Sequence, residues 1–431
     1  MEKVTERIKN IQQQLITSND TGSSTFVLVQ DKSKDYYKTT KEDLEKLYKY
    51  QDEQDQLSSK NPFAVDTITE NTMVLTLNRP KKLNVLNTWL FVNLKKRFEF
   101  YRDNDKLNLL IIRGNGEKAY CAGGDISELS TQTRAIGPIF PRYFFSKEYN
   151  LDYTAATIKK PKVAFWKGIS FGGGLGISIH AEFRIVTETT IWSMPEVGIG
   201  LFPDVGGSYF LPRLKHDGIG NYIALTGEKL NGQDCLHFGI ATHFVENKNL
   251  DILEQRLIKV MSEQGAHNRY QKNIELIDSV INEFAVHFKQ DETTSLINNW
   301  LVLSKCFSNK HATLWDILKS LEDTNTPLTK SLVSSIRTKS PTSLRLAFNQ
   351  IKYGGSMSLE EVFKMEYRLA IRSLSNNEFI EGVRATVIDK DKNPKWNPPT
   401  LELLTDDYIN HYFSPLPEEF PIGNDQIYIK Q

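Results

Sequence analysis

Two acidic residues stand close together in a stretch where charges are otherwise rare. Glu196 and Asp204 lie eight positions apart in the run MPEVGIGLFPDVGGSYFLPRL, which is rich in glycine, proline and large apolar residues. Carboxylates in such surroundings are costly unless they are paired or functional, and two close carboxylates raise each other's pKa, which suits acid/base chemistry near neutral pH. Taken alone, either acid is slightly better explained by helix capping. A catalytic interpretation of the pair therefore requires evidence that a reacting group binds beside it.

Two glycine-rich corners precede these acids. GGD at positions 123–125 and FGGGLG at 171–176 each follow a strand-like run and precede a helix start. Glycine lets backbone N–H groups approach a ligand, and a helix N-terminus adds partial positive charge. A tight turn explains the first corner better when it is taken alone. Together, however, two corners can each supply one N–H to a single carbonyl oxygen, as acyl transfer requires.

Other catalytic arrangements fit the sequence less well. The second corner matches the dinucleotide motif only loosely, and no Gly-Lys-Ser/Thr of a P-loop follows it. Ser170 and Ser178 lack a GxSxG context, and none of the eight histidines forms an HExxH motif or a Cys/His cluster. His180 is better explained as a helix residue in the core or at an interface. We therefore expect no metal site.

The residues around the corners predict an α/β fold. From Ala64 on, AVDTI, TMVLTLNR, LNLLIIRG and PKVAFWKGIS have the composition of strands, whereas WLFVNLKKRFEFY has helical spacing. The strands alternate with helices over connections too long for hairpins, which indicates stacked ββα units. Later runs such as LDILEQRLIKVM have the spacing of amphipathic helices.

The pattern of strand-like and helix-like runs divides the chain into three predicted regions. Residues 1–62 form an N-terminal extension that is charged and in part helical, residues 63–248 form the α/β core, and residues 249–431 form a helical C-terminal region. We favour a solvated extension or small accessory element over a partner-binding module for the first region.

The overall composition excludes several classes of protein. The 431 residues include 53 basic and 53 acidic side chains, so a general electrostatic role on nucleic acid or an anionic membrane is not expected. No apolar run is long enough to cross a membrane, and the start MEKVTERIKN lacks the apolar stretch of a secretory signal. Cys121, Cys235 and Cys306 are widely spaced and odd in number, which predicts free thiols in a reducing compartment.

The blocks AGGDI, GGGLG and MPE, in this order, resemble the crotonase (enoyl-CoA hydratase/isomerase) superfamily over residues 74–243. The resemblance implies a spiral of ββα units that binds an acyl-CoA, with the N–H groups of Gly124 and Gly173 forming the oxyanion hole. It implies no separate cofactor, because coenzyme A is part of the substrate.

The same resemblance implies where coenzyme A lies. In the superfamily it follows the loop after the first strand, here RPKKLN at 79–84, and the chain that leads into the first glycine corner. This implies contacts with Lys81, Lys82, Ala122 and Asp125. Lysines there can meet phosphates, although solvated surface charge explains Lys81 and Lys82 equally well.

The carboxylates decide the closest branch of the superfamily. Hydratases place a glutamate where this chain has Gly176, and a second one where it keeps Glu196. Asp204, together with Glu148 in FFSKEYNL, resembles the family of 3-hydroxyisobutyryl-CoA hydrolases, in which these three acids and the glycine at Gly173 contact substrate. The runs GIATHFV and EGVRATVIDKDKNPKWNP strengthen this resemblance.

The resemblance implies hydrolysis of a short hydroxyacyl-CoA thioester, namely 3-hydroxyisobutyryl-CoA to 3-hydroxyisobutyrate and CoA in valine catabolism. Glu196 would act as nucleophile or general base, Asp204 would orient the substrate hydroxyl or share the acid/base task, and Glu148 would bind the hydroxyl. Two alternatives stay open: an enoyl-CoA hydratase or isomerase, and a crotonase-fold component of a mitochondrial assembly such as the ribosome.

The compartment and the assembly state are also implied only by resemblance. Valine catabolism implies mitochondria, although the N-terminus shows no clear transit peptide, and the cytoplasm is the alternative. Members of the superfamily form trimers or hexamers, which leaves a homo-oligomer open. The extra helical region could instead cover that surface and leave a monomer or dimer.

Overall fold

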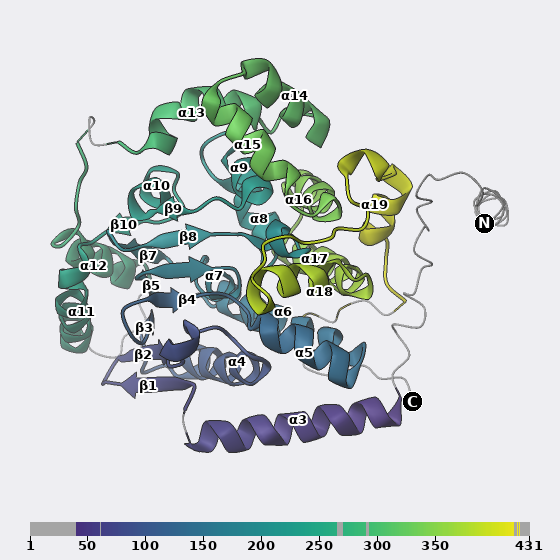
Figure 1. The fold of residues 1–431 in the computed structure, drawn as a ribbon. Coiled ribbons are helices and arrows are strands. Elements are labelled where there is room, and N and C mark those ends of the chain that lie inside the picture. The colour runs from purple at the N-terminus through teal and green to yellow at the C-terminus, as the bar shows by residue number, and fades with distance from the viewer. Residues whose placement is uncertain are drawn as a thin grey trace, which may run out of the picture.

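The computed structural model describes residues 40–60, 62–264, 270–289, 293–417, 420 and 422. Two β-sheets form its centre (Figure 1). The larger sheet has the order β1-β2-β3-β5-β7-β10, with bounds β1 (Ala64–Ile68), β2 (Thr72–Leu77), β3 (Leu109–Gly114), β5 (Lys162–Trp166), β7 (Phe183–Val186) and β10 (His243–Phe244). The smaller sheet has the order β4-β6-β8-β9, with bounds β4 (Ala119–Cys121), β6 (Ile169–Phe171), β8 (Ile191–Ser193) and β9 (Leu230–Asn231).

The central strands of the larger sheet are buried on both faces, whereas the edge strand β1 is largely exposed. Only β1 is antiparallel to its neighbour, and the other strands are parallel. Alternate residues of β3 point to opposite faces: Leu110 and Ile112 pack in the main core, and Leu109 and Ile111 pack in a second core. Burial on both sides explains the uninterrupted apolar run of this strand.

Successive strands alternate between the two sheets. The strands β3, β5 and β7 join the larger sheet, and the next strands β4, β6 and β8 join the smaller one. This confirms the predicted spiral of ββα units. The helices and 3₁₀ turns among these strands are η1 (Pro80–Lys82), α4 (Thr88–Asp103), α5 (Ile126–Ile136), α6 (Ile139–Thr157), α7 (Gly173–Gly176), η2 (Glu196–Ile199), α8 (Gly207–Phe210), η3 (Leu211–Arg213), α9 (Ile219–Thr226) and α10 (Gly232–His237).

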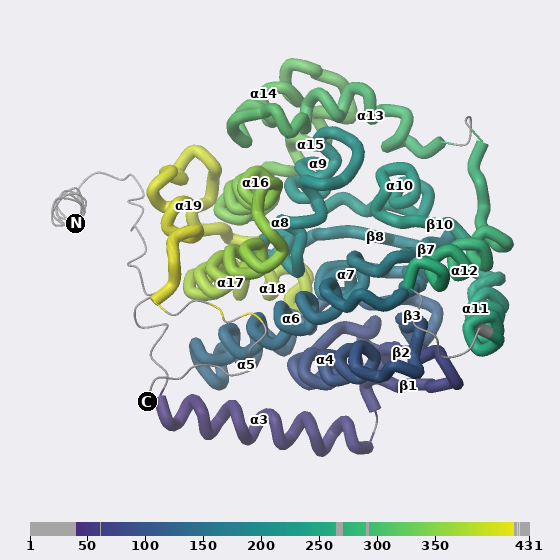
Figure 2. Tube along the Cα trace, turned by 180° about the vertical axis from the view of Figure 1, so that it is seen from behind, coloured from purple at the N-terminus to yellow at the C-terminus, as the bar shows by residue number. Residues whose placement is uncertain are grey.

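The part of the chain after β10 is helical. Helix α17 packs on α6 and α16 packs on α9, so the main core contains residues from both the α/β region and the helical region (Figure 2). The helices are α11 (Leu250–Gln264), α12 (Tyr270–Asn282), α13 (Ser295–Cys306), α14 (Leu314–Thr324), α15 (Pro327–Arg337), α16 (Pro341–Gly354), α17 (Leu359–Ser375), α18 (Glu378–Val383), the π-helical turn η5 (Arg384–Ile388) and α19 (Asp406–Phe413).

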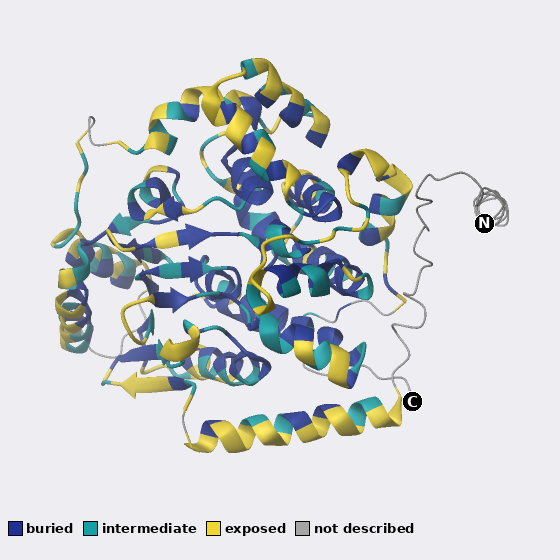
Figure 3. Cartoon of the chain, viewed as in Figure 1, coloured by how far each residue is buried: buried dark blue, intermediate teal, exposed yellow. Residues whose placement is uncertain are grey.

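Helix α3 (Lys41–Lys60) belongs to the predicted N-terminal extension. It lies along the outside of the molecule next to α4, α5 and α6, with one side exposed (Figure 3). Leu47 and Tyr50 are its main buried contacts. The remainder of the extension, residues 1–39 and 61, lies outside the described residues.

Two local predictions have clear outcomes. Cys121, Cys235 and Cys306 are buried free thiols, as predicted. The helix at the second glycine corner is shorter than predicted, because α7 ends at Gly176 and His180 lies in the turn that follows. Burial lowers the pKa of His180 to about 4, so this side chain is neutral at pH 7.

Candidate active site

The site begins where three parallel strands end at one edge of the smaller sheet. Strand β4 pairs with β6 and β6 pairs with β8, all parallel. The carboxyl ends of these strands therefore lie side by side. Gly124 follows β4, Gly173 follows β6 and Glu196 follows β8, so the topology brings the three sequence motifs together.

The two glycine corners are in close contact. A Cβ added at Gly173 would lie 3.1 Å from the backbone nitrogen of Gly124, and Gly172 has a φ of 41°, in the left-handed region that favours glycine. Among the described residues, neither the Gly124 nor the Gly173 amide has a hydrogen-bond acceptor. Both amides are therefore available to a ligand between the corners.

A cavity of about 780 Å³ opens at these corners. Six of the predicted site residues line it, namely Ala122, Gly124, Glu148, Gly173, Glu196 and Asp204. The rest of its wall comes from the glycine corners, the end of β6, α5, α6, η2 with its flanking residues, and two segments of the helical region. These residues are Gly123, Ile126, Leu129, Phe144, Phe145, Phe171, Gly172, Pro195, Gly198, Ile199, Leu201, Arg337, Thr338, Lys339, Thr386, Val387, Lys392, Asn393, Pro394 and Trp396.

Three acids meet at the cavity, and all are buried. Glu148, Glu196 and Asp204 are 3%, 7% and 6% exposed. A Cβ at Gly173 would lie 2.5 Å from Oε1 of Glu148, and one at Gly172 would lie 2.8 Å from Oε1 of Glu196. Two carboxyl groups therefore flank the second glycine corner.

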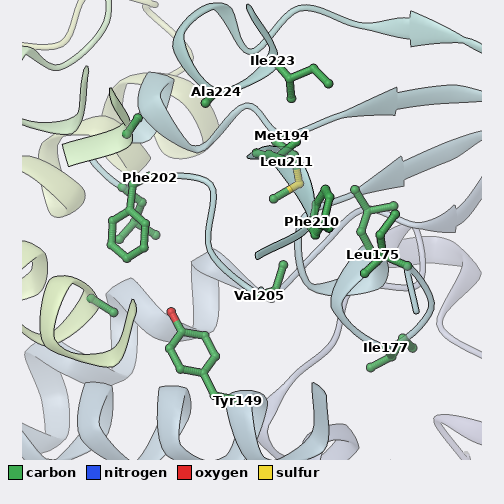
Figure 4. Close-up of a cluster of buried hydrophobic side chains, with 14 of the residues drawn as sticks. Tyr149, Leu175, Ile177, Met194, Phe202, Val205, Phe210, Leu211, Ile223 and Ala224 are labelled. Carbon is green, nitrogen blue, oxygen red and sulfur yellow. The ribbon is translucent and has the colours of Figure 1, made fainter. Parts of the chain in front are cut away.

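Hydrogen bonds fix Asp204 but leave part of Glu196 unpaired. The Tyr149 hydroxyl donates to Oδ2 of Asp204 at 2.9 Å. Figure 4 shows Tyr149 in the same buried cluster as Phe202 and Val205, which flank Asp204 in the sequence. Oε2 of Glu196 is buried without a partner among the described residues. A buried oxygen without a partner is expected where substrate or water binds.

Burial makes these acids unusually basic. It raises the pKa of Glu148 and of Glu196 well above their ordinary values, and the nearby Asp204 adds to both shifts. Burial raises the pKa of Asp204 to about 7, against the opposing effect of the Tyr149 hydrogen bond. The acids cannot all ionise together, so the group shares protons near neutral pH.

A fourth acid, Asp152, was missed by the sequence reasoning. A Cβ at Gly176 would lie 2.6 Å from each carboxyl oxygen of Asp152, so this side chain fills the space where hydratases were expected to carry a glutamate. Both oxygens are buried without a partner among the described residues, although Asp152 does not line the cavity. Its position four residues after Glu148 on one helix was the available signal.

The helical region holds the Asp204 turn in place. Glu366 on α17 accepts hydrogen bonds from the backbone N–H groups of Gly206 at 2.8 Å and Ser208 at 2.9 Å. Val205 has a φ of 52°, which is strained for a β-branched residue and needs such support. These bonds join residues about 160 positions apart, so no local sequence signal marks Glu366.

The other predicted coenzyme A contacts are not part of the cavity wall. Asp125 caps α5 by accepting from the Glu128 N–H at 3.2 Å, and it pairs with Arg79 at 3.1 Å and Lys82 at 3.6 Å. Lys81 and Lys82 are exposed. None of Asp125, Lys81 and Lys82 lines the cavity wall.

The fold agrees with the comparisons to known proteins. A family model for enoyl-CoA hydratase/isomerase matches residues 72–413, and the chain belongs to this family. The match continues well past residue 243 and includes most of the helical region. The structure is similar to that of a carnitinyl-CoA dehydratase from Mycobacterium thermoresistibile, with 30% identity, a TM-score of 0.74, and coverage of 84% of this chain and 99% of that one.

Curated relatives share more of the sequence. The proteins named 3-hydroxyisobutyryl-CoA hydrolase, mitochondrial, from Gallus gallus and Homo sapiens are each 40% identical to this chain. Each alignment covers 80% of this chain and 86% of the relative. The chain thus matches these hydrolases over most of their length.

Proposed function

We propose that this chain hydrolyses the thioester of a short hydroxyacyl-CoA, with 3-hydroxyisobutyryl-CoA as its substrate. One observation carries the proposal: Glu148, Glu196 and Asp204 meet two free glycine amides in a single cavity. The 40% identity to hydrolases named for this substrate supports the same choice.

The glycine corners would polarise the thioester. The Gly124 and Gly173 amides would donate to its carbonyl oxygen, each contributing about 3 kcal/mol in the transition state. Glu196 would then attack the carbonyl carbon itself or remove a proton from a water that attacks it. In either case water supplies the new acid oxygen, the C–S bond breaks, and the departing CoA sulfur takes up a proton.

The remaining acids would recognise the acyl group. A hydroxyl on the acyl chain can donate to a carboxylate, and Glu148 and Asp204 both border the cavity. Tyr149 would keep Asp204 oriented through its hydrogen bond. An acyl-CoA without the hydroxyl cannot donate this hydrogen bond to the buried acids, so we expect it to be a poorer substrate.

Hydration of an enoyl-CoA is a second candidate function because Asp152 places a carboxyl group beside Gly176. A hydratase needs two acids at the double bond, and Glu196 with Asp152 would be that pair. The position of Asp152 outside the cavity wall favours the hydrolase.

A substrate panel tests the choice directly. Purified protein would be mixed with 3-hydroxyisobutyryl-CoA, isobutyryl-CoA and crotonyl-CoA, while free thiol and enoyl absorbance are followed together. The proposal predicts thiol release that is fastest with the hydroxyacyl ester. Loss of enoyl absorbance without thiol release would support the hydratase instead.

We also propose a mitochondrial location, supported by the word mitochondrial in the names of the relatives. Among the described residues, no helix is long and apolar enough to cross a membrane. The assembly state of the chain stays a prediction, and sedimentation of the purified protein would measure it.

A further inference from the structure

The helical region supplies one wall of the active-site cavity. Two of its segments line the cavity, residues 337–339 at the end of α15 and residues between 386 and 396 that follow α18. The cavity is therefore incomplete without a part of the chain that lies more than a hundred residues beyond Glu196. This wall carries cationic side chains, whereas the acids lie near the glycine corners.

The wall is attached directly to the loop that carries Glu196. The backbone N–H of Ser340 donates to the carbonyl oxygen of Val197 at 3.1 Å. A Cβ at Gly382 would lie 2.4 Å from the carbonyl carbon of Ile199, so α18 touches the backbone of η2. Lys339, next to Ser340, is therefore held at a fixed position relative to Glu196.

The second segment is fastened to the first. The Trp396 indole N–H donates to the carbonyl oxygen of Thr338 at 2.9 Å. Arg384 pairs with Asp389 and Asp391, both at 2.7 Å, which closes the intervening loop. This loop brings Lys392, with a φ of 55°, to the cavity wall.

The cations of this wall differ in their partners. Arg337 already pairs with Glu322 and Glu402. Among the described residues, neither Lys339 nor Lys392 has an ion-pair or hydrogen-bond partner for its ammonium group, and Lys339 is partly buried. Burial lowers the pKa of Lys339, and the attraction of Glu228 offsets this effect only in part. An anionic ligand would therefore stabilise the charged ammonium group.

We infer that Lys339, with Lys392 beside it, binds a phosphate group of the coenzyme A moiety. This inference rests on the proposed function, because a hydroxyacyl-CoA carries its negative charges only on phosphates. The buried acids repel those phosphates from the glycine corners, and the two lysines attract them to the other wall. The cavity thereby sets the direction in which the substrate enters.

This assignment differs from the one that the sequence suggested. Lys82 lies 3.6 Å from Asp125 and is largely exposed, so its charge is already balanced outside the cavity. Within the described part of the chain Lys339 forms no ion pair, although Glu228 attracts its charge, and Lys339 lies in the cavity wall. We therefore expect the larger share of phosphate binding from Lys339.

The test compares thioesters that differ only in their phosphates. Lys339→Met keeps most of the side-chain volume and removes the charge. Its KM would be measured with 3-hydroxyisobutyryl-CoA, the dephospho-CoA ester and the pantetheine ester. We expect KM for the CoA ester to rise about tenfold or more, because a charge-assisted hydrogen bond contributes about 1.5–3 kcal/mol. We expect kcat to change less than twofold and KM for the pantetheine ester to stay unchanged.

Two controls make the result specific. Lys395→Met removes an exposed charge from the same loop but outside this cavity wall, and it should leave every KM unchanged. Lys339→Arg should retain most of the affinity. An unchanged KM in Lys339→Met, or an equal rise with the pantetheine ester, would overturn the inference.

Binding of free coenzyme A separates this inference from the proposed function. Calorimetry on wild type and Lys339→Met needs no hydrolysis, and the inference predicts a weaker Kd in the variant. Weaker binding together with no thiol release from any hydroxyacyl ester would keep the phosphate site and reject the hydrolase. Equal Kd values would reject the phosphate site while leaving the hydrolase intact.

Discussion

The α/β region and the helical region make different contributions to one site. The first, between β1 and β10, supplies the glycine amides together with Glu148, Glu196 and Asp204. The second, from α11 to α19, holds the Asp204 turn through Glu366 and closes the cavity with residues 337–339 and 386–396. Changes in the first should affect the chemical step, and changes in the second should affect geometry and substrate binding.

The largest effect is expected at the second glycine corner. In Gly173→Ala the new methyl group would lie 2.5 Å from Oε1 of Glu148 and 3.1 Å from the Gly124 nitrogen. It would push both groups from their places, so we expect kcat to fall roughly 100-fold or more, as for loss of an oxyanion-hole donor. Thiol-release kinetics would measure the fall. Gly198→Ala is the control because a Cβ there would meet no atom within 4 Å, and equal activities of the two variants would contradict the account.

A smaller effect is expected from the helical region. Glu366→Gln keeps one acceptor oxygen but turns an amide N–H toward the Gly206 or Ser208 amide. We expect kcat to fall about tenfold, with less change in KM, because removing one buried hydrogen bond costs about 1–3 kcal/mol. Glu360→Gln, in an exposed pair with Lys364 on the same helix, should be neutral. A loss of stability with normal kcat would show that Glu366 does not position Asp204.

Glu366 should also make the free energy of unfolding depend on pH. Burial raises the pKa of Glu366 to about 8, from an ordinary value of 4.5. A raised folded-state pKa means that its stabilising contribution is complete below about pH 4 and is lost as pH rises through about 8. Urea unfolding of wild type and Glu366→Gln should therefore show the stability difference moving in favour of the variant between about pH 4.5 and pH 8 and staying constant above that. A constant difference would mean that folding does not raise the pKa of Glu366.

Substitutions in α3, which belongs to neither region, are expected to have the smallest effect on activity. The Tyr50 hydroxyl donates to Oε1 of Glu128, which also accepts from Thr88. Tyr50→Phe should lower the free energy of unfolding by about 1 kcal/mol and leave kcat unchanged. Tyr48→Phe, on the exposed side of α3, is the matched control. A drop in kcat with Tyr50→Phe would show that α3 contributes to the active site.

The parts of the site that depend on residues close together in the sequence could be predicted from the sequence alone. A glycine corner after a strand, or a Pro-Glu after the next strand, depends on a few neighbouring residues. Because β4, β6 and β8 are parallel and adjacent, the corners at their carboxyl ends lie side by side, and no contact between distant residues has to be known to predict this. The ββα spiral was predictable for the same reason, since buried strands and connecting helices have distinct apolar periods.

The parts that depend on contacts between distant residues were not predictable. Glu366 lies in an ordinary amphipathic helix, and only the tertiary structure brings it to Gly206. Nothing in the sequence distinguishes Lys339 from the other lysines. The hydrogen bond between Ser340 and Val197 places it in the cavity wall, and this contact is seen only in the structure. Asp152 has only its spacing of four residues from Glu148 as a sequence signal, and its position beside Gly176 depends on the tertiary structure.

The central claim is that the Glu196 carboxyl group, beside the two glycine corners, drives thioester hydrolysis. The most direct measurement is release of free CoA thiol from 3-hydroxyisobutyryl-CoA by wild type and by Glu196→Gln, with unfolding followed in parallel. The account predicts turnover by wild type, a fall of about 100-fold or more in the variant, and an intact fold in both. Turnover by folded Glu196→Gln at close to the wild-type rate would contradict it.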